Sequence, residues 1–356
     1  MSSRVPSATV TAQCREIFVA WGMTAEHARV TAERLEYADL HGVDSHGIAL
    51  LPLYARLRGE NRINFRPELR MVCETPVIAL MDADGGLGQI AGTRAMLLAI
   101  EKARAAGLAA VAVRNSNHFG AAGAYAMLAA EAGLVGMAFS AAWDAAIVPT
   151  HGSEPRFGTN PLAFAAPAGE DAPFCFDVAT STVAIGKLRL AELHGRPLEP
   201  GWALDASGAV TTDPKAALAS RLLTPLGGTP QLSSHKGYGL AALVEILSTM
   251  LSGAAYCMTR DKEKPFLDVG HFFLAIDPAA FRPDGGFEAD VADMMRTLRK
   301  TRPAQASQPV LSPGDPEARA FADRSANGIP MPATLVKQVR DIAAGCEAAW
   351  LLENPQ

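Results

Sequence analysis

The chain has 356 residues and a net charge of −5, with Arg299-Lys300-Thr301-Arg302 as its densest basic cluster, a balance that argues against nucleic-acid binding. Its five cysteines are odd in number, widely spaced and without a CxxC pair, so they predict neither a disulfide framework nor a zinc knuckle. No apolar run reaches the ~18 residues of a membrane span, and a reducing cytoplasm is the expected compartment.

Helical patterns fill the N-terminal part of the chain. Helices are expected over residues 12–21, 25–40 and 48–57. Thr24 is placed to cap the second helix at its start, and Gly42 is placed to end it.

Strand and helix patterns alternate in the central part. Strands are expected over 77–81, 108–113, 134–140, 161–166, 173–177 and 270–276, and helices over 93–106, 121–132 and 240–251. Residues 181–235 are rich in loops, 300–316 form a Pro-rich connector, and a last helix is expected over 332–352. Such alternation predicts an α/β fold built on a sheet.

A glycine-rich turn follows the strand at 77–81. Gly86, Gly88 and Gly92 approach the dinucleotide pattern G-x-G-x-x-G, but the third glycine comes one residue late. The next strand ends in Val113-Arg114, without the acidic residue that the pattern requires there. We therefore favour an ordinary turn over a Rossmann cofactor site.

Two histidines lie in polar turns. His118 follows the strand 108–113 and precedes an alanine-rich helix, and His46 lies in Asp44-Ser45-His46-Gly47. An imidazole with an ordinary pKa of about 6.5 can exchange a proton near neutral pH. A structural histidine in a turn is the alternative for each, and five other histidines are expected to be surface or core residues.

A third candidate precedes the buried helix at 240–251. In His235-Lys236-Gly237-Tyr238-Gly239, the start of a helix offers backbone N–H groups and Lys236 adds a positive charge. That combination suits a phosphate or pyrophosphate. On the residues alone, a capped helix with a surface lysine is the more frequent explanation.

Together these segments resemble the type-2 malate/L-lactate dehydrogenase family of NAD(P)-dependent oxidoreductases, which includes ureidoglycolate and sulfolactate dehydrogenases, diketogulonate reductase and cyclic-imine carboxylate reductases. The matching stretches are 40–47, 115–123, 158–161, 177–181, 235–240, 270–273, 313–315 and 328–330. They follow the family order from about residue 35 to 335, so the resemblance covers nearly the whole chain.

The resemblance implies an α/β fold unlike the Rossmann fold, with a mixed-sheet NAD(P)-binding domain and packed N- and C-terminal helical parts. The expected division is 1–75 for the N-terminal helical part, 76–300 for the mixed core and 301–356 for the C-terminal helical segment. A homodimer with active sites near the subunit interface is implied as well. The expected partner is a small-molecule substrate, with no nucleic acid and no membrane.

The implied reaction is hydride transfer between NAD or NADP and a small 2-oxo/2-hydroxy acid; NADPH-dependent reduction of a cyclic imine carboxylate is the alternative. His118 is the first choice for proton transfer and His46 the second, and Ser45 and Ser116 are expected to contact the substrate. The resemblance places the cofactor on Asp177, Ala179, Thr180, Ser181, His235, Lys236, Gly237, Gly314, Thr159 and Asn160. No residue pattern suggests a metal.

The chain departs from the family pattern near the expected substrate pocket. Leu50 and Leu53 stand where arginines are common, and Ala141 stands where the family usually has asparagine. Leucine cannot hold a carboxylate through paired hydrogen bonds as arginine does. We therefore expect an atypical substrate that is larger, less acidic, or held by another cation such as Arg56 or Arg156.

Overall fold

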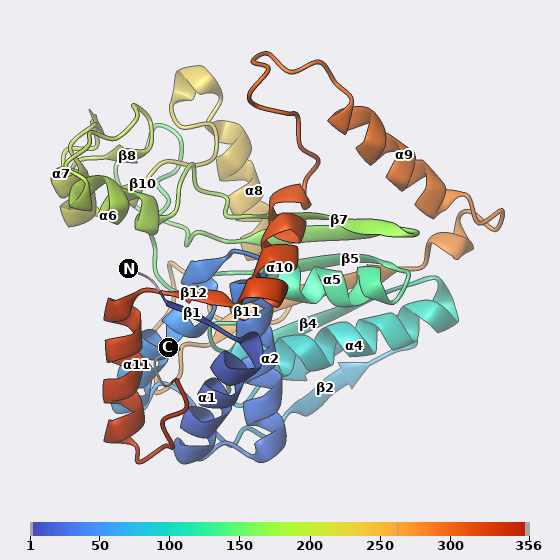
Figure 1. The fold of residues 1–356 in the computed structure, drawn as a ribbon, viewed down its shortest axis with the longest axis horizontal. Coiled ribbons are helices and arrows are strands. Elements are labelled where there is room, and N and C mark those ends of the chain that lie inside the picture. Colours follow the sequence, from blue (N-terminus) through green and yellow to red (C-terminus); the bar gives the residue numbers. More distant parts are fainter. Residues whose placement is uncertain (1–2, 262, 353–356) are drawn as a thin grey trace.

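A seven-stranded mixed sheet forms the centre of the structure, with strand order β2-β3-β4-β11-β5-β6-β7 (Figure 1). The strands are β2 (Arg70–Glu74), β3 (Ile78–Asp82), β4 (Leu108–Ser116), β5 (Val135–Ser140), β6 (Leu162–Ala168), β7 (Asp171–Val178) and β11 (Val269–Ile276). β3 and β4 are parallel, and the other neighbouring pairs are antiparallel. The computed structural model describes residues 3–261 and 263–352.

β11 is inserted between β4 and β5 although it lies far from both in the sequence. His271 of β11 is opposite Val113 of β4 and opposite Ser140 of β5. A doubly wound Rossmann sheet is mostly parallel, so this antiparallel insertion confirms the prediction of a different, mixed sheet.

Helices α4 (Gly88–Ala106) and α5 (Gly123–Glu131) cover the sheet. Ala91, Ala95, Ala99 and Ala103 recur every four residues along α4, and all are fully buried. This small-residue stripe lets the helix approach the strands closely. Gly107, with φ of +89°, ends α4 in a conformation that favours glycine.

The glycine-rich turn forms the start of α4, which begins five residues before the predicted helix. A side chain at Gly88 would lie 2.5 Å from Phe119 Cβ and 2.6 Å from the Asn117 carbonyl oxygen. Glycine is required here because the start of α4 packs directly against the turn that carries His118. The rejection of a dinucleotide fingerprint is consistent with this packing.

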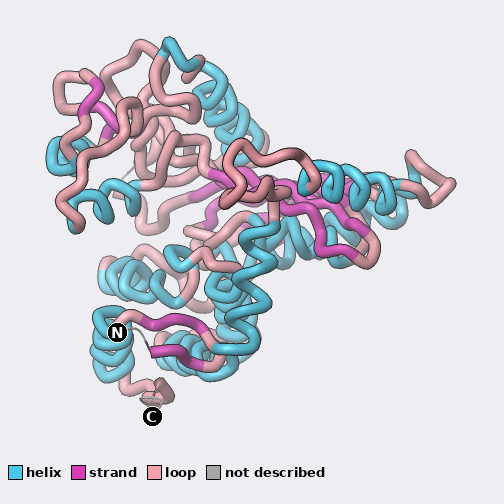
Figure 2. The backbone as a smooth tube through the Cα atoms, turned by 45° about the horizontal axis from the view of Figure 1, so that its top comes forward, coloured by secondary structure: helices cyan, strands magenta, loops and turns pink. Residues whose placement is uncertain are grey.

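The N- and C-terminal helical parts pack together on a second hydrophobic core (Figure 2). Its elements are β1 (Ser3–Val5), α1 (Ser7–Ala20), α2 (Ala25–Leu40), α3 (Leu51–Gly59), β12 (Ile329–Met331) and α11 (Ala333–Gly345). The Gln13 side chain joins the two ends by donating to the Ala349 carbonyl at 3.0 Å and accepting from the Leu351 N–H at 2.7 Å. The predicted packing of the two helical parts is confirmed, although the last helix ends at Gly345 and not at residue 352.

The loop-rich segment contains more regular structure than the sequence predicts. It includes α6 (Ile185–Leu193), α7 (Pro214–Ser220) and a small sheet of β8 (Ala203–Leu204), β9 (Val210–Thr211) and β10 (Leu222–Leu223). α8 (His235–Glu245) follows and continues as a π-helical turn over Ile246–Met250. In Figure 1 this region lies across the sheet from α1, α2 and α11.

Two polar helices complete the fold. α9 (Phe287–Arg299) packs Ala292 and Met295 against the outer part of the sheet, and α10 (Asp315–Asn327) lies beside α2. Among residues 3–261 and 263–352, no helix has the length and apolar character needed to cross a bilayer.

Candidate active site

His118 is held in a turn at the end of β4. The Asn117 side chain, which is fully buried, accepts the His118 N–H at 2.9 Å and donates to the Arg62 carbonyl at 2.8 Å. His118 Nδ1 lies 2.9 Å from the Tyr54 hydroxyl and receives the Gly120 N–H at 3.3 Å. Nε2 makes no hydrogen bond within the described part of the chain, so it is the ring nitrogen left for a ligand.

Tyr54 is a site residue that the sequence did not reveal. It lies on α3, is fully buried, and receives a hydrogen bond at 2.6 Å from Gln89 Nε2 of α4. Gln89 Oε1 is buried without a partner among residues 3–261 and 263–352. Tyr54 falls in a stretch with a helical apolar pattern and Gln89 falls in the glycine-rich turn, and in neither stretch does the sequence distinguish a packing residue from one that contacts a site histidine.

The environment keeps His118 uncharged at neutral pH. Desolvation in the cavity wall, together with the nearby His46 and His271, lowers the pKa of His118 to about 3. The neutral imidazole is therefore the dominant form near pH 7, and it can accept a proton.

His46, the second choice for proton transfer, lies beside His118. Their rings are 5.7 Å apart between centroids and inclined by 25°, and the Ser45 hydroxyl is 2.8 Å from His46 Nδ1. Burial lowers the pKa of His46 too. Ser45 and the two histidines are thus brought together from separate parts of the fold.

The His46 turn, η1 (Asp44–His46), is fastened to α2 by Asp39. The buried Asp39 carboxylate accepts the Ile48 N–H at 2.8 Å, and burial raises the pKa of this carboxyl to about 7. A side chain at Gly47 would lie 1.8 Å from Asp39 Oδ1. Arg324 of α10 secures the turn from outside by pairing with Asp44.

His46 and His118 face a cavity of about 180 Å³. Trp143 forms one wall and meets His118 edge to face, with ring centroids 5.5 Å apart. Arg221 is the cation on this cavity, and it pairs with Asp144 at 2.5 Å. Arg56 and Arg156, the cations suggested by the sequence, line a neighbouring cavity that shares Trp143 and Asp144 with this one.

A second cavity of about 240 Å³ adjoins the first and shares His46, Gly120, Thr159 and Pro161 with it. Asp177 and Ala179 lie on its wall. Asp177 is open to the cavity and accepts the Gly123 N–H at 2.7 Å at the start of α5. Desolvation by the surrounding protein, reinforced by Glu317, raises the pKa of Asp177 to about 6.

The predicted cofactor segments 158–161, 177–181 and 235–237 are brought side by side. Thr180 donates to the Thr159 carbonyl from its backbone at 2.9 Å and from its hydroxyl at 3.0 Å. Leu226 joins the second segment to the third, because its N–H donates to the Thr180 carbonyl and its carbonyl accepts the Gly237 N–H. His235 and Lys236 are exposed on the first turn of α8.

Several predicted site residues have structural contacts instead of facing a cavity. A side chain at Gly237 would lie 2.3 Å from Leu226 N, so glycine is required for this close approach. Asn160 is fully buried and bonds Glu245 at 2.7 Å, the Ala241 carbonyl at 3.0 Å and the Ala142 N–H at 3.1 Å. Further members of this group are Ser181, which bonds the Val183 carbonyl, and Gly314, which packs on Cys175.

Ser116 is placed in the sheet interior, beneath the His118 turn. Its hydroxyl is 3.0 Å from His271 Nε2, and His271 Nδ1 is 2.9 Å from the Ser140 hydroxyl. Burial lowers the pKa of His271 to about 3. The neutral His271 ring stacks on Phe119 at 4.7 Å between centroids and supports the turn from below.

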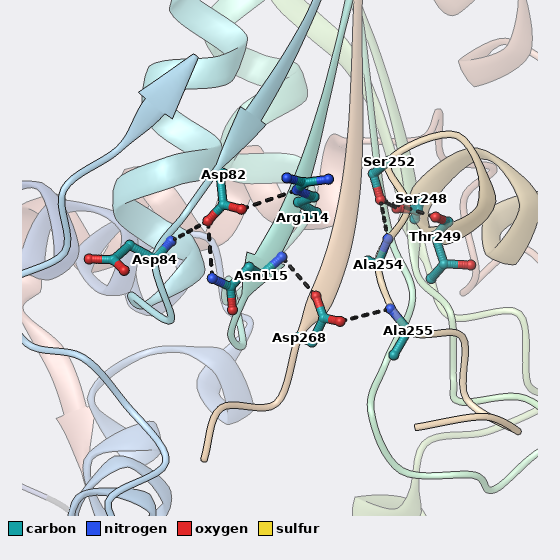
Figure 3. Close-up of polar contacts among 10 residues, drawn as sticks. All are labelled: Asp82, Asp84, Arg114, Asn115, Ser248, Thr249, Ser252, Ala254, Ala255 and Asp268. Carbon is teal, nitrogen blue, oxygen red and sulfur yellow. Dashed lines mark hydrogen bonds and ion pairs between the residues drawn. The ribbon is translucent and has the colours of Figure 1, made fainter. Parts of the chain in front are cut away.

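A polar network fixes the end of β4 just before that turn (Figure 3). Asp82 binds Arg114 at 3.1 Å and the Asn115 side chain at 3.0 Å, and Asp268 accepts the Asn115 N–H at 2.9 Å. Arg114, at the end of the strand that follows the glycine-rich turn, is thus paired within the protein. The network secures the strand from which the His118 turn begins.

The chain is similar to known dehydrogenases over nearly its whole length. The family model for malate/L-lactate dehydrogenase matches residues 5–340. The malate dehydrogenase of Pyrococcus horikoshii is 36% identical over 342 residues, which cover 96% of this chain and 94% of that protein.

Solved structures agree with these relatives. The malate dehydrogenase of Entamoeba histolytica matches with a TM-score of 0.93 and 32% identity, covering 98% of this chain and 99% of that one. The delta1-piperideine-2-carboxylate reductase of Pseudomonas syringae matches with a TM-score of 0.84 and 31% identity, covering 96% and 99% of the two chains.

The fold and the relatives together define an oxidoreductase of the hydroxy-acid dehydrogenase type. The chain belongs to the malate/L-lactate dehydrogenase family. The resemblance inferred from the sequence is confirmed.

Proposed function

We propose that this protein transfers a hydride between NAD or NADP and a small 2-oxo/2-hydroxy acid, with His118 as the acid/base group. The observation that carries the proposal is the setting of the imidazole. His118 Nδ1 is engaged by Tyr54 and Gly120, while Nε2 is unengaged in a ring that lines a cavity. A general base must be held in place and yet free to meet the proton it takes.

Tyr54 supports both protonation states of His118. A tyrosine hydroxyl can donate to Nδ1 or accept from it. When Nδ1 carries the ring proton and donates it to Tyr54, Nε2 can take a proton from a substrate hydroxyl during oxidation, and the resulting imidazolium can return a proton to a carbonyl oxygen during reduction. His46, stacked beside His118 and held by Ser45, orients the substrate in this proposal.

The second cavity fits a nicotinamide cofactor. Gly120 and Gly123 leave room for close approach, and Asp177 offers a carboxylate to hydroxyl or amide groups. Lys236, exposed at the start of α8, would neutralise phosphate charge. When bound, the cofactor supplies or accepts the hydride.

Cofactor binding and turnover after His118→Ala test this function. NADH and NADPH affinities are measured by nicotinamide fluorescence, and turnover is measured with a panel of 2-oxo acids. We expect the variant to keep cofactor affinity and to lose turnover by at least about 100-fold. His194→Ala, at an exposed histidine in the turn after α6, is the matched control. Full activity in His118→Ala would show that another group moves the proton.

Reduction of a cyclic imine is the second candidate, favoured by the structural match to a piperideine-carboxylate reductase. The same cavity and histidine pair would then face a C=N bond. Turnover of delta1-piperideine-2-carboxylate with NADPH, with all 2-oxo acids left unchanged, would select this reaction over the first.

We further propose a cytoplasmic homodimer. Its five cysteines are free thiols, which is typical of a reducing compartment. An exposed apolar face on α8 and the following turn offers a surface for subunit contact, formed by Leu243, Ile246, Met250 and Leu251. Light scattering coupled to gel filtration measures the mass, and a monomer at micromolar concentration would contradict the dimer. The division at residues 75 and 300 stays a prediction.

A further inference from the structure

A third cavity shares Trp143 and Asp144 with the cavity at His118 and is the largest of the three, at about 570 Å³. Its charged lining consists of Arg56, Arg62, Arg156 and Arg260 against Glu60 and Asp144. Glu154 pairs with Arg156, and the carboxylates of Glu245 and Asp268 act electrostatically on Arg260. What the cavity offers an anion is therefore unused guanidinium N–H donors and not a net positive charge.

Arg260 lacks partners within this lining. Its Nη2 donates to the Ala255 carbonyl at 2.7 Å, whereas Nε and Nη1 are buried without a partner among residues 3–261 and 263–352. A buried charged group with unused donors is unfavourable unless an anion pairs with it.

Arg56 and Arg156 can leave their present carboxylate partners and bind a ligand at little cost in free energy. Arg56 pairs with Glu60 at 3.4 Å and Arg156 pairs with Glu154, and both arginine side chains are at least half exposed, at 60% and 50%. Exposed pairs of this kind contribute little to stability. An anion entering the cavity can therefore replace Glu60 and Glu154 as the partner.

The arginine cavity is linked closely to the catalytic histidine. Trp143 lines both cavities and contacts the His118 ring, and α3 carries Arg56 two residues after Tyr54. Leu50 and Leu53 stand at the two positions where the family pattern has arginine, and both leucines pack in the N-terminal core. An acidic group remote from the reacting carbon therefore finds its cations across Trp143.

We propose that this arginine cavity is a second anion subsite, which receives the distal carboxylate of a substrate that passes the edge of Trp143. The inference rests on the proposed function and narrows its substrate class to 2-oxo diacids. Because the chain must pass an indole ring, five or six carbons suit the site better than four.

Matched pairs of oxo acids test the subsite. 2-Oxoglutarate is compared with 2-oxopentanoate, and 2-oxoadipate with 2-oxohexanoate, so that each pair differs only in the distal carboxylate. The wild-type protein should prefer the diacid in kcat/KM. Arg260→Met and the more exposed Arg156→Met should each lower the diacid-to-monoacid ratio about tenfold. Arg302→Met, at an exposed arginine remote from these contacts, is the control and should keep the ratio.

Calorimetric titration with glutarate separates the subsite from the reaction. Glutarate has both carboxylates but no carbonyl, and its Kd should rise about tenfold in Arg260→Met and Arg156→Met. If no oxo acid is reduced while this rise is seen, the subsite stands and the proposed reaction fails. If oxo acids are reduced but neither the ratio nor the Kd changes in either variant, the subsite is overturned and the reaction stands.

Discussion

The Tyr54 hydroxyl lies 2.9 Å from His118 Nδ1, joining residues 64 positions apart in the sequence. Tyr54 belongs to the N-terminal helical part and His118 to the sheet. The orientation of the His118 ring thus depends on how these two parts pack.

Tyr54→Phe should therefore lower kcat by about tenfold or more, since the ring loses the group that orients Nδ1. Because Gln89 also loses its partner, the free energy of unfolding should fall by about 1–2 kcal/mol. Steady-state kinetics and urea unfolding measure the two effects, with Tyr256→Phe as the control, because Tyr256 is half-buried and lines none of the three cavities described above. Unchanged kcat at full cofactor affinity would remove Tyr54 from the proposed mechanism.

The pH dependence of oxidation should reflect the depressed pKa of His118. With a pKa of about 3, the ring stays neutral and able to accept a proton from pH 8 down to pH 5. An ordinary histidine with a pKa of about 6.5 would lose roughly thirtyfold of its basic form by pH 5. We expect kcat/KM for the hydroxy acid to be nearly flat over this range at saturating cofactor. Asp177→Asn serves as the control, because Asp177 titrates near pH 6; a fall centred at pH 6.5 in both proteins would contradict the prediction.

His271 should make the fold less stable in mild acid. Its folded pKa of about 3 lies below the unfolded value of about 6.5, so only the unfolded chain takes up its proton as pH falls through 6.5. The contribution of His271 to the free energy of unfolding is full above pH 6.5 and should decrease by about 2 kcal/mol between pH 7.5 and 5. Denaturant unfolding of His271→Gln should show a destabilisation that is smaller at pH 5 by this amount. An equal destabilisation at both pH values would mean that His271 is protonated in the folded protein.

Lys236 should act on cofactor binding and not on the chemical step. Lys236→Met should raise the cofactor Kd about tenfold and weaken its dependence on salt, because a charge-to-phosphate contact is lost. Lys187→Met, an exposed lysine on α6, is the control. If Lys187→Met and Lys236→Met change the Kd equally, the effect is one of net charge and not of a site.

Local sequence patterns predicted many of the helices and strands. α2 has the same bounds as the predicted helix 25–40. Its signals are local in the sequence: the spacing of its apolar residues, the Thr24 cap at its start and Gly42 just after its end. The position of β11 could not be predicted, since pairing with β4 joins residues more than 150 positions apart. β2 was missed because all five of its side chains are exposed and show no alternation.

The site was predicted unevenly for the same reason. His46 and His118 stand out as polar residues in turns, and the structure brings them together. Tyr54 and Gln89 were missed because they sit inside helices and acquire their role only when α3 and α4 meet. Arg221 was missed because it lies in the loop-rich segment and reaches the cavity only through the fold, where it pairs with Asp144, 77 positions away in the sequence.

Asp39 and Gly47 occupy, in effect, one side-chain position between them. The carboxylate of Asp39 fills the volume that a side chain at 47 would need, and it holds the Ile48 N–H from there. The two positions therefore cannot vary independently: enlarging residue 47 requires shortening residue 39, and shortening residue 39 alone leaves a hole and an unpaired N–H under His46. The conformation of the His46 turn therefore depends on helix α2, so a substitution at Asp39 alters the candidate site without changing any residue that lines its cavities.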